Sequence, residues 1–267
     1  MHPSAIFIIA LISAYGLFRD SYVADLWNGN VSTFVADIGI PYAVSVAIYI
    51  VLGSLFTVVD ILQPEWLMKY KIQQRKARQP INYAKLIKCI WQVSVNILVI
   101  APLYQYLVAY PIMKWCGYAY DTQLPNMLQL ILQLLGVSIT FEIMFYYIHR
   151  MFHTKPFYGW FHKKHHEWTA PIAIAALYAH PVEHVCANSI PFFVGQIITN
   201  AHPIVMCIVS TFGTINVLFT HSGFNFPFYS QIGHDQHHEK FMVNFGFTGI
   251  LNMDVLHGTN YVVDANA

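Results

Sequence analysis

Charged residues are scarce in this chain of 267 residues, since Asp, Glu, Lys and Arg together make up 10% of it. A soluble domain carries about 25% charged residues, so this composition cannot cover a water-exposed surface of that size. A mean hydropathy of +0.46 and a hydrophobic content of 56% favour a membrane protein. The formal net charge of +1 argues against a nucleic-acid partner.

Several redox and cofactor motifs are also missing. The four cysteines form no C-x-x-C pair, which argues against a disulfide framework or a thiolate zinc site. We expect them to pack as small apolar residues. The chain has no G-x-G-x-x-G dinucleotide fingerprint. It also lacks the H-P-G-G haem signature of a fused cytochrome b5 domain. Any electrons from NAD(P)H must therefore arrive indirectly, through another protein.

Charge-free windows predict the membrane spans. Three windows are long enough to cross a bilayer as helices: Ile38–Val59, Cys89–Met113 and Thr122–Ile148. Pro102 is expected to kink the second of these helices. Glu142 is the one charged residue inside the third window.

The region between His184 and His234 contains no Asp, Glu, Lys or Arg, and it can hold two shorter helices broken near Asn200–Pro203. Ahead of all these windows, Ala5–Phe18 is short for a full span and follows no basic residue, so we expect an interfacial or partly inserted helix there. The predicted fold class is all-α. It is a polytopic membrane bundle of four to five helices or hairpin segments, with a cytosolic helical cap.

Basic residues indicate the orientation. Seven of the 14 Lys and Arg residues fall between Lys69 and Lys88, and the positive-inside rule places that loop in the cytosol. The next two spans then lead out and back, and a hairpin returns the chain to the same side. The histidine-rich segments after residue 148 should therefore all emerge on the cytosolic face.

Histidine is abundant near the C-terminus, where 13 of the 14 histidines follow residue 148. Eight of them form one H-x-x-x-H pair and two H-x-x-H-H groups, with each group expected on one helix face: His149, His153, His162, His165, His166, His234, His237 and His238. Packed together, these side chains would repel one another if protonated, and neutral rings would need partners for both nitrogens. A metal ion takes one nitrogen per ring and favours the neutral form. Eight imidazoles are too many for one ion, so the pattern predicts a dinuclear site. Iron, zinc and copper all suit imidazole, which leaves the metal open.

Glu142 lies seven residues before His149, two helical turns away, and so faces the same way. An intramembrane carboxylate is a candidate functional group. Its expected role is to accept the second N–H of a ligand histidine. A hydrated carboxylate near the interface is the alternative.

Three further histidines are candidates for the site. His221 ends an apolar helix and could be an additional ligand. His180 precedes Pro181, which suits the first turn of a helix, so His180 is expected near the N-cap and within reach of the metal or the substrate. His184 is either part of the active site or an interfacial residue. His257 is expected to be structural.

Taken together, these motifs resemble the sterol desaturase/fatty acid hydroxylase superfamily of integral-membrane oxygenases. The three boxes read "HRMFH", "HKKHH" and "HDQHH", in the order found in that superfamily. The flanking stretches "YAHPVEH", "HSGFNFPF" and "LHGTN" look like the branch that holds the C4-methylsterol oxidases. Within it, the likeness is greatest to the fatty acid hydroxylase domain-containing protein 2 group. The resemblance covers roughly residues 129–260.

The resemblance implies a non-haem di-iron site, with O2 as co-substrate, in the endoplasmic reticulum membrane. It assigns metal ligation to the eight box histidines and divides the chain into membrane spans (1–120), a catalytic domain (121–262) and a short tail (263–267). The implied electron donor is cytochrome b5 or its reductase. The basic segment between Lys69 and Lys88 could dock an acidic donor or contact anionic lipid headgroups.

The expected substrate is a membrane lipid, with the C4 methyl of a sterol as the first hypothesis. A fatty acyl or sphingolipid hydroxylase or desaturase of the same superfamily is the second. The third is a metal-bound membrane scaffold, with zinc or iron, that has lost turnover.

Overall fold

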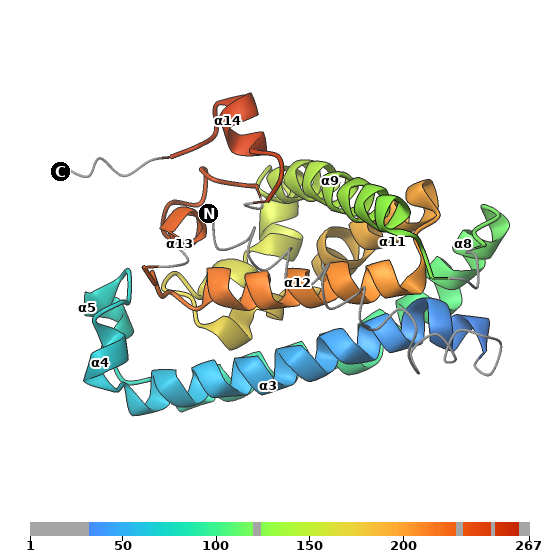
Figure 1. The fold of residues 1–267 in the computed structure, drawn as a ribbon. Helices are drawn as coiled ribbons and strands as arrows, with labels where there is room; N and C mark the ends of the chain where they lie inside the picture. The colour runs from blue at the N-terminus through green and yellow to red at the C-terminus, as the bar shows by residue number, and fades with distance from the viewer. Residues whose placement is uncertain (1–31, 120–123, 228–231, 247–248, 262–267) are drawn as a thin grey trace.

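The computed structural model describes residues 32–119, 124–227, 232–246 and 249–261 (Figure 1). Within these ranges the regular structure is helical, apart from one isolated antiparallel bridge between Lys71 and Phe224. The predicted all-α helix bundle is therefore confirmed, while the helix expected over Ala5–Phe18 lies outside the described residues.

With π- and 3-10 segments written as η, the elements are η1 (Val35–Gly39), α3 (Ile40–Leu62), α4 (Glu65–Met68), α5 (Gln74–Ala77), α6 (Tyr83–Val95), η2 (Asn96–Ile100), α7 (Ala101–Tyr104), η3 (Gln105–Ala109), α8 (Tyr110–Trp115), α9 (Met127–Phe152), η4 (Tyr158–His162), η5 (His165–Glu167), η6 (Ala173–Leu177), α10 (Pro181–Glu183), η7 (His184–Ser189), α11 (Ile190–Thr199), α12 (Pro203–His221), α13 (Ile232–Lys240) and α14 (Met253–His257).

Four of these helical segments are long and apolar enough to cross a membrane, judged by length and composition: Val35–Leu62, Tyr83–Trp115, Met127–Phe152 and Pro203–His221. The first two enclose the predicted windows. The third begins at Met127 because Asn126 accepts from the Gln129 N–H and forms a capping box with it. The predicted hairpin is also present, because Asn200 takes a left-handed φ of 46° between α11 and α12.

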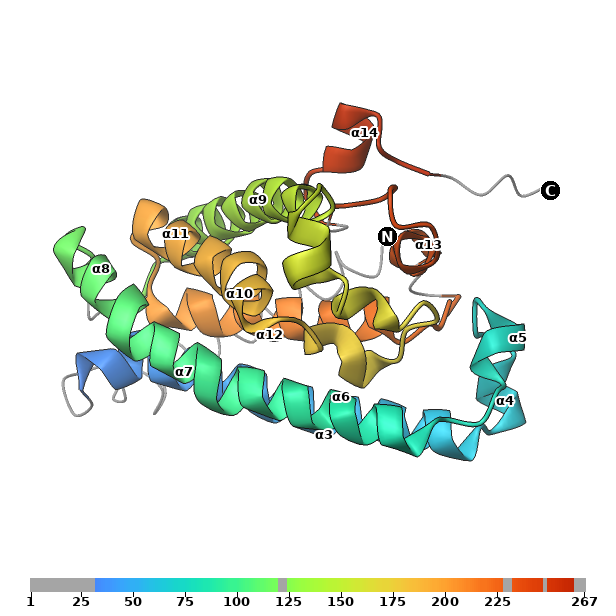
Figure 2. The same ribbon diagram turned by 180° about the vertical axis from the view of Figure 1, so that it is seen from behind.

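Prolines account for most of the π-turns. The segments η1, η2, η3 and η7 each come just before an α-helix with proline in its first two positions: Pro41, Pro102, Pro111 and Pro191. Proline lacks an N–H and crowds the carbonyl one turn earlier, so a widened turn relieves that contact. Around Pro102, where a kink is expected, α6, α7 and α8 follow one another without a break, and the helix bends upward towards α8 (Figure 2).

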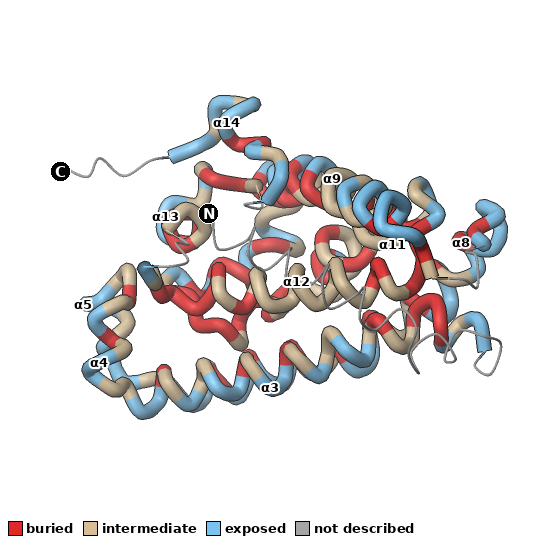
Figure 3. The backbone as a smooth tube through the Cα atoms, in the orientation of Figure 1, coloured by how far each residue is buried: buried red, intermediate tan, exposed pale blue. Residues whose placement is uncertain are grey.

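Apolar side chains cover the outside of the bundle. Leu55 is 58% exposed, Leu98 is 61% exposed and Trp91 is 71% exposed. The tube in Figure 3 shows this exposure along the outer side of α3. Inside, polar groups such as Asn96 and Gln196 are buried and hydrogen-bonded to backbone carbonyls. In a bilayer this arrangement places hydrocarbon against lipid and satisfies the polar groups within the protein.

Two helix pairs make the most extensive contacts: α3 with α12, and α9 with α11. In the second pair, a Cβ on Gly195 would lie 3.1 Å from the Cα of Val137, so glycine lets the two backbones approach. The spans bring α5 and α13 to one end of the bundle and α8 to the other (Figure 1). We call the first of these the histidine end.

Candidate metal centre

Four separate segments bring histidines to the histidine end. The last turn of α9 supplies His149, and His153 follows as the cap of that helix, four residues later on the same face. The short elements η4 and η5 carry the second box, α12 ends at His221, and α13 carries the third box. The chain therefore brings histidines to this end twice, with α9 and again with α12, before all of them are in place.

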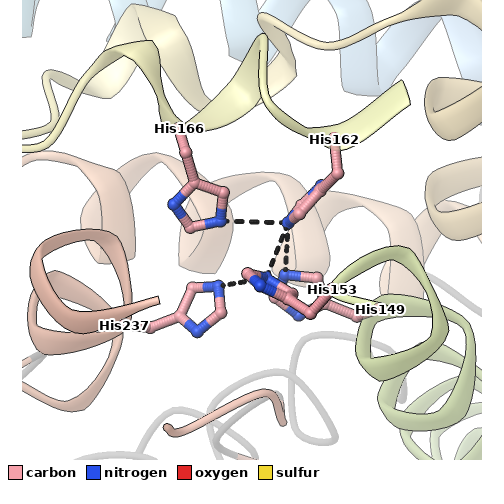
Figure 4. Close-up of side chains that lie close together, drawn as sticks. All are labelled: His149, His153, His162, His166 and His237. Carbon is pink, nitrogen blue, oxygen red and sulfur yellow. Dashed lines mark hydrogen bonds between the residues drawn. The ribbon is translucent and has the colours of Figure 1, made fainter. Parts of the chain in front are cut away.

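The histidines form two clusters, in each of which the candidate ligand atoms lie within 4.8 Å of one another. The first, drawn in Figure 4, contains His149, His153, His162, His166 and His237. The second contains His165, His221, His234 and His238. The clusters adjoin, since the ring centroids of His166 and His238 are 4.8 Å apart.

Each H-x-x-H-H box contributes to both clusters. In the second box the outer pair, His162 and His166, enters the first cluster, while the middle His165 enters the second. In the third box the outer pair enters the second cluster and His237 enters the first. Consecutive helical residues point about 100° apart, so neighbouring histidines in one box diverge. The expected single shared face is thus wrong for the middle histidine, and each of these boxes links the two clusters.

The first cluster is centred on the Nε2 atom of His162. This atom lies 3.2 Å from Nε2 of His149, 2.8 Å from that of His153 and 3.0 Å from that of His166. The fifth ring, His237, has its Nε2 3.1 Å from that of His153. Nitrogens bound to one ion at roughly 2.0–2.1 Å are about 3.0–3.4 Å apart. The observed spacing therefore fits a shared metal ion.

The outer ring nitrogens in this cluster fix the tautomers. His149 Nδ1 donates to the Phe245 carbonyl at 2.7 Å, and His237 Nδ1 donates to the Val243 carbonyl at 2.7 Å. A carbonyl only accepts, so the Nε2 atoms of both rings carry lone pairs that point into the cluster. Two lone pairs that face each other repel and form no hydrogen bond. A metal ion between the two nitrogens would accept both lone pairs.

The second cluster has the same organisation. His221 Nδ1 donates to the Val217 carbonyl at 2.9 Å, and His238 Nδ1 donates to the Trp168 carbonyl at 3.1 Å. The inward Nε2 of His238 is buried without a hydrogen-bond partner among the described residues. An orphaned buried acceptor of this kind is costly unless a ligand satisfies it. The residues of both clusters therefore fit bound metal ions.

Burial also keeps these rings in the neutral form that binds metals. It lowers the pKa of His162, His237 and His238 well below the usual range, and neighbouring histidines lower it further. The pKa of His153 falls to about 2 for the same reasons. Metal ions compete with protons for imidazole nitrogen, so the folded chain presents ligands that are already deprotonated.

Glu183 supplies a carboxylate behind the first cluster. Its Oε1 accepts from His162 Nδ1 at 2.8 Å, and both side chains are almost completely buried. Burial raises the pKa of Glu183 well above its usual range. A cation at the opposite nitrogen of His162 would favour the charged carboxylate. Glu183 lies in the sequence stretch "PVEH", in the first turn after Pro181. Its spacing from the histidine boxes did not identify it as a partner of a ligand histidine.

A cavity of about 410 Å³ extends from the second cluster into the membrane part of the bundle. Its walls come mainly from α3, α12 and the η7–α11 helix, with Phe141 and Phe145 on α9, and residues between Ile97 and Gln105 and between Asn244 and Tyr261 also line it. Along α12 it runs from Met206 to His221, which is about 22 Å of helix. Figure 1 shows α12 between α3 and α9, so the cavity lies inside the bundle.

A smaller void of about 30 Å³ touches both clusters. His149 of the first cluster and His165, His221 and His234 of the second line it, together with Asn188. A space of this size holds a water molecule or a diatomic gas. Asn188 also lines the large cavity, so this residue stands between the cavity and the clusters.

Comparison with known proteins agrees with this geometry. A family model described as "Fatty acid hydroxylase" matches residues 134–259, the part that carries all nine clustered histidines. The chain belongs to the sterol desaturase/fatty acid hydroxylase superfamily. How the chain divides around this hydroxylase domain stays a prediction.

Curated relatives extend the similarity beyond the hydroxylase domain. "Fatty acid hydroxylase domain-containing protein 2" of Macaca fascicularis is 38% identical over 211 residues, 78% of this chain and 62% of the relative. "Fatty acid hydroxylase ahd1" of Mycosarcoma maydis is 37% identical over 78% of this chain and 53% of the relative. "Methylsterol monooxygenase 1-2" of Arabidopsis thaliana is 35% identical over 64% of this chain and 58% of the relative. The chain thus spans between half and two thirds of these proteins, and no solved structure matches it.

The additional candidates take different positions in the hydroxylase domain. His221 joins the second cluster. His180 caps α10 by accepting the Val182 N–H, as expected for an N-cap, and it is not among the clustered histidines. His184 is likewise outside both clusters, but it lines the large cavity. His257 bonds Tyr147 through Nε2, which fits a structural role.

Glu142 anchors the C-terminal part of the domain. Its two carboxylate oxygens accept from the backbone N–H groups of Ile250 and Leu251, at 2.6 and 2.5 Å. A Cβ on Gly249 would lie 1.8 Å from Glu142 Oε1, so only glycine fits there. Phe245, whose carbonyl holds His149, is itself held by Asp254, which accepts the Phe245 N–H at 2.8 Å. The structure therefore shows Glu142 accepting from backbone N–H groups, and not from a ligand histidine as expected.

Proposed function

We propose that this protein is a membrane-bound non-haem di-iron oxygenase that oxidises a C–H bond of a lipid. The observation that carries the proposal is the pair of adjoining histidine clusters at the end of a long intramembrane cavity. Nine imidazoles in two groups suit two iron ions, and zinc is the alternative that imidazole ligands leave open. When bound, the irons would supply O2 activation.

The reaction class balances with an external reductant. A lipid R–H, one O2, two electrons and two protons give R–OH and one water. The electrons are proposed to come from NAD(P)H through cytochrome b5 or its reductase, since the chain carries no nicotinamide or haem motif. The void beside Asn188 touches both clusters and is a fitting place for O2.

The protein's own residues hold and orient the reactants. The histidines would bind the metals, and the carbonyls of Phe245 and Val243 keep two of their rings in the ligating tautomer. The cavity, with its mainly apolar lining, would take up the lipid and would keep bulk water away from the clusters. Phe141 and Phe145 provide an apolar wall where the chain or ring system would lie.

The C4 methyl of a sterol is the proposed substrate position. Methylsterol monooxygenases are among the relatives, which favours this choice. In such a sterol the 3-hydroxyl is on the neighbouring carbon, so a polar partner is needed close to the metals. Asn188 and His184 line the cavity and can serve that hydroxyl. The fungal relative named a fatty acid hydroxylase supports an acyl lipid as the second candidate.

The proposed location is the endoplasmic reticulum membrane, with the clusters on the cytosolic face. The basic residues between Lys69 and Lys88 lie at the histidine end, where the positive-inside rule expects the cytosol (Figure 1). Lipids dissolved in the bilayer could then enter from the side, while electrons arrive from the aqueous phase.

Lipid profiling of a deletion strain tests the substrate. Accumulation of 4-methylsterols, reversed by the intact gene but not by a His238→Ala copy, is the expected result. Loss of hydroxylated acyl chains with unchanged sterols would move the assignment to the acyl lipid. Purified, iron-loaded protein that consumes no O2 with either lipid would leave only a metal-bound scaffold.

A further inference from the structure

The basic segment between Lys69 and Lys88, predicted above to dock an acidic donor or contact lipid headgroups, is largely occupied by internal contacts. Lys76 pairs with Glu239 and Arg78 pairs with Glu65. Lys71 is buried against Asp60. Four ion pairs in all use cations of the segment 69–88. Most of its charge therefore holds the loop on the protein and is not available to a partner.

A second basic segment has no such neutralisation. The stretch from His149 to His166 contains Arg150, Lys155, Lys163 and Lys164 but no acidic residue. None of these cations forms an ion pair within the described part of the chain. Lys155 and Lys163 are exposed on either side of η4.

An exposed tryptophan stands between these two lysines. Trp160 on η4 is 64% exposed, whereas large aromatic side chains in a folded interior are mostly buried. Its ring centroid is 6.2 Å from that of Phe161. Tryptophan is one of the residue types enriched at protein-binding hot spots, and the two lysines add positive charge to this surface.

Aromatic rings connect this surface with the first cluster. Phe161 lies 6.1 Å from Phe152, and Phe152 is stacked on His162 with 6.1 Å between centroids and 19° between planes. His162 is the ring whose Nε2 centres the first cluster (Figure 4). Three ring contacts thus join Trp160, at the surface, to a metal-binding histidine.

We propose that Trp160, Lys155 and Lys163 form the docking surface for an acidic protein that carries one electron at a time. The inference rests on the proposed oxygenase function, which requires two electrons per O2. Two reduced carriers would dock in turn, each becoming oxidised by one electron that passes inward along Phe161 and Phe152. Opposite charge would steer the carrier to this face, and the bare tryptophan would hold it there.

Binding can be measured apart from catalysis. The full-length protein in lipid nanodiscs is titrated with the soluble haem domain of cytochrome b5 at low and high salt. Lys155→Glu with Lys163→Glu should weaken binding at least tenfold at low salt, and Trp160→Ala should do the same at either salt. The control is Lys69→Glu with Arg75→Glu, which changes the same charge on two exposed loop cations outside the ion pairs. It should keep wild-type affinity within about twofold.

A second readout separates docking from function. When the protein is first reduced by stoichiometric dithionite without O2 and then exposed to O2, the η4 variants should oxidise lipid in one turnover as the wild type does, and with the haem domain as reductant they should be at least tenfold slower. Equal affinity in the η4 variants, or a loss confined to the loop control, would overturn the docking surface. If the wild type oxidises no lipid with either reductant, the oxygenase proposal fails while the binding result still stands.

Discussion

Glu183→Gln removes the carboxylate behind His162 and keeps its shape. The hydrogen bond to His162 Nδ1 is 2.8 Å long and joins side chains that are 1% and 6% exposed, so solvent screens it little. Losing a carboxylate behind a ligand histidine costs roughly 10–100-fold in metal affinity. That range corresponds to about 1.4–2.7 kcal/mol. Glu183 Oε2 is buried without a hydrogen-bond partner among the described residues. An amide N–H₂ group at that position would therefore also be without an acceptor.

Metal affinity is the quantity to measure. Iron per chain is determined while a competing chelator is raised, for wild type, Glu183→Gln and the control Glu239→Gln. Glu239 directly follows the third box but is exposed and pairs with Lys76. We expect the first cluster to release its ion at roughly 10–100-fold lower chelator strength in Glu183→Gln only. Equal retention in all three proteins would refute the role given to Glu183.

Three further outcomes follow from the same contacts. Although His221 lies outside the three boxes, His221→Ala should lose one of the two metal ions, and metal analysis measures this loss. The control His257→Ala should keep both ions. Two retained ions in His221→Ala would contradict the second cluster. Gly249→Ala forces a Cβ onto Glu142 Oε1 and should destabilise the chain by about 2–4 kcal/mol, and an unchanged thermal midpoint would contradict that contact. In metal-free protein the buried histidines have a pKa below the unfolded value of about 6.5, so the unfolded state binds more protons and stability should fall as the pH drops below that value; a pH-independent unfolding free energy between pH 7 and 5 would be inconsistent.

Composition and charge pattern were enough to predict the membrane architecture. The long charge-free windows became spans because a bilayer requires about 20 apolar residues whatever their neighbours are. The break near Asn200 was equally local, since a left-handed residue followed by a proline ends one helix and begins the next. The π-turns before the prolines were not predicted, because they depend on how each helix relieves the carbonyl contact.

The division of the site into two clusters needed three-dimensional information. Sequence spacing put His165 and His166 in one group, yet the turn from η4 to η5 sends them to different clusters. The hydrogen-bond partners of the ring nitrogens could not be predicted from the sequence for the same reason. Glu142 lies two helical turns before His149 on the same helix face, but its carboxylate accepts from backbone N–H groups 108 and 109 residues away. Glu183 meets His162 only because α10 folds back over η4.

The most direct test of the di-iron oxygenase is an isotope experiment on purified protein with a counted metal content. Iron-loaded protein in nanodiscs is given a reduced electron carrier, 18O2 and a 4-methylsterol, with an acyl lipid in a parallel sample. We predict two irons per chain and one 18O atom in the oxidised lipid, with neither found in His238→Ala. Protein that holds two irons but transfers no 18O to any lipid would contradict the account.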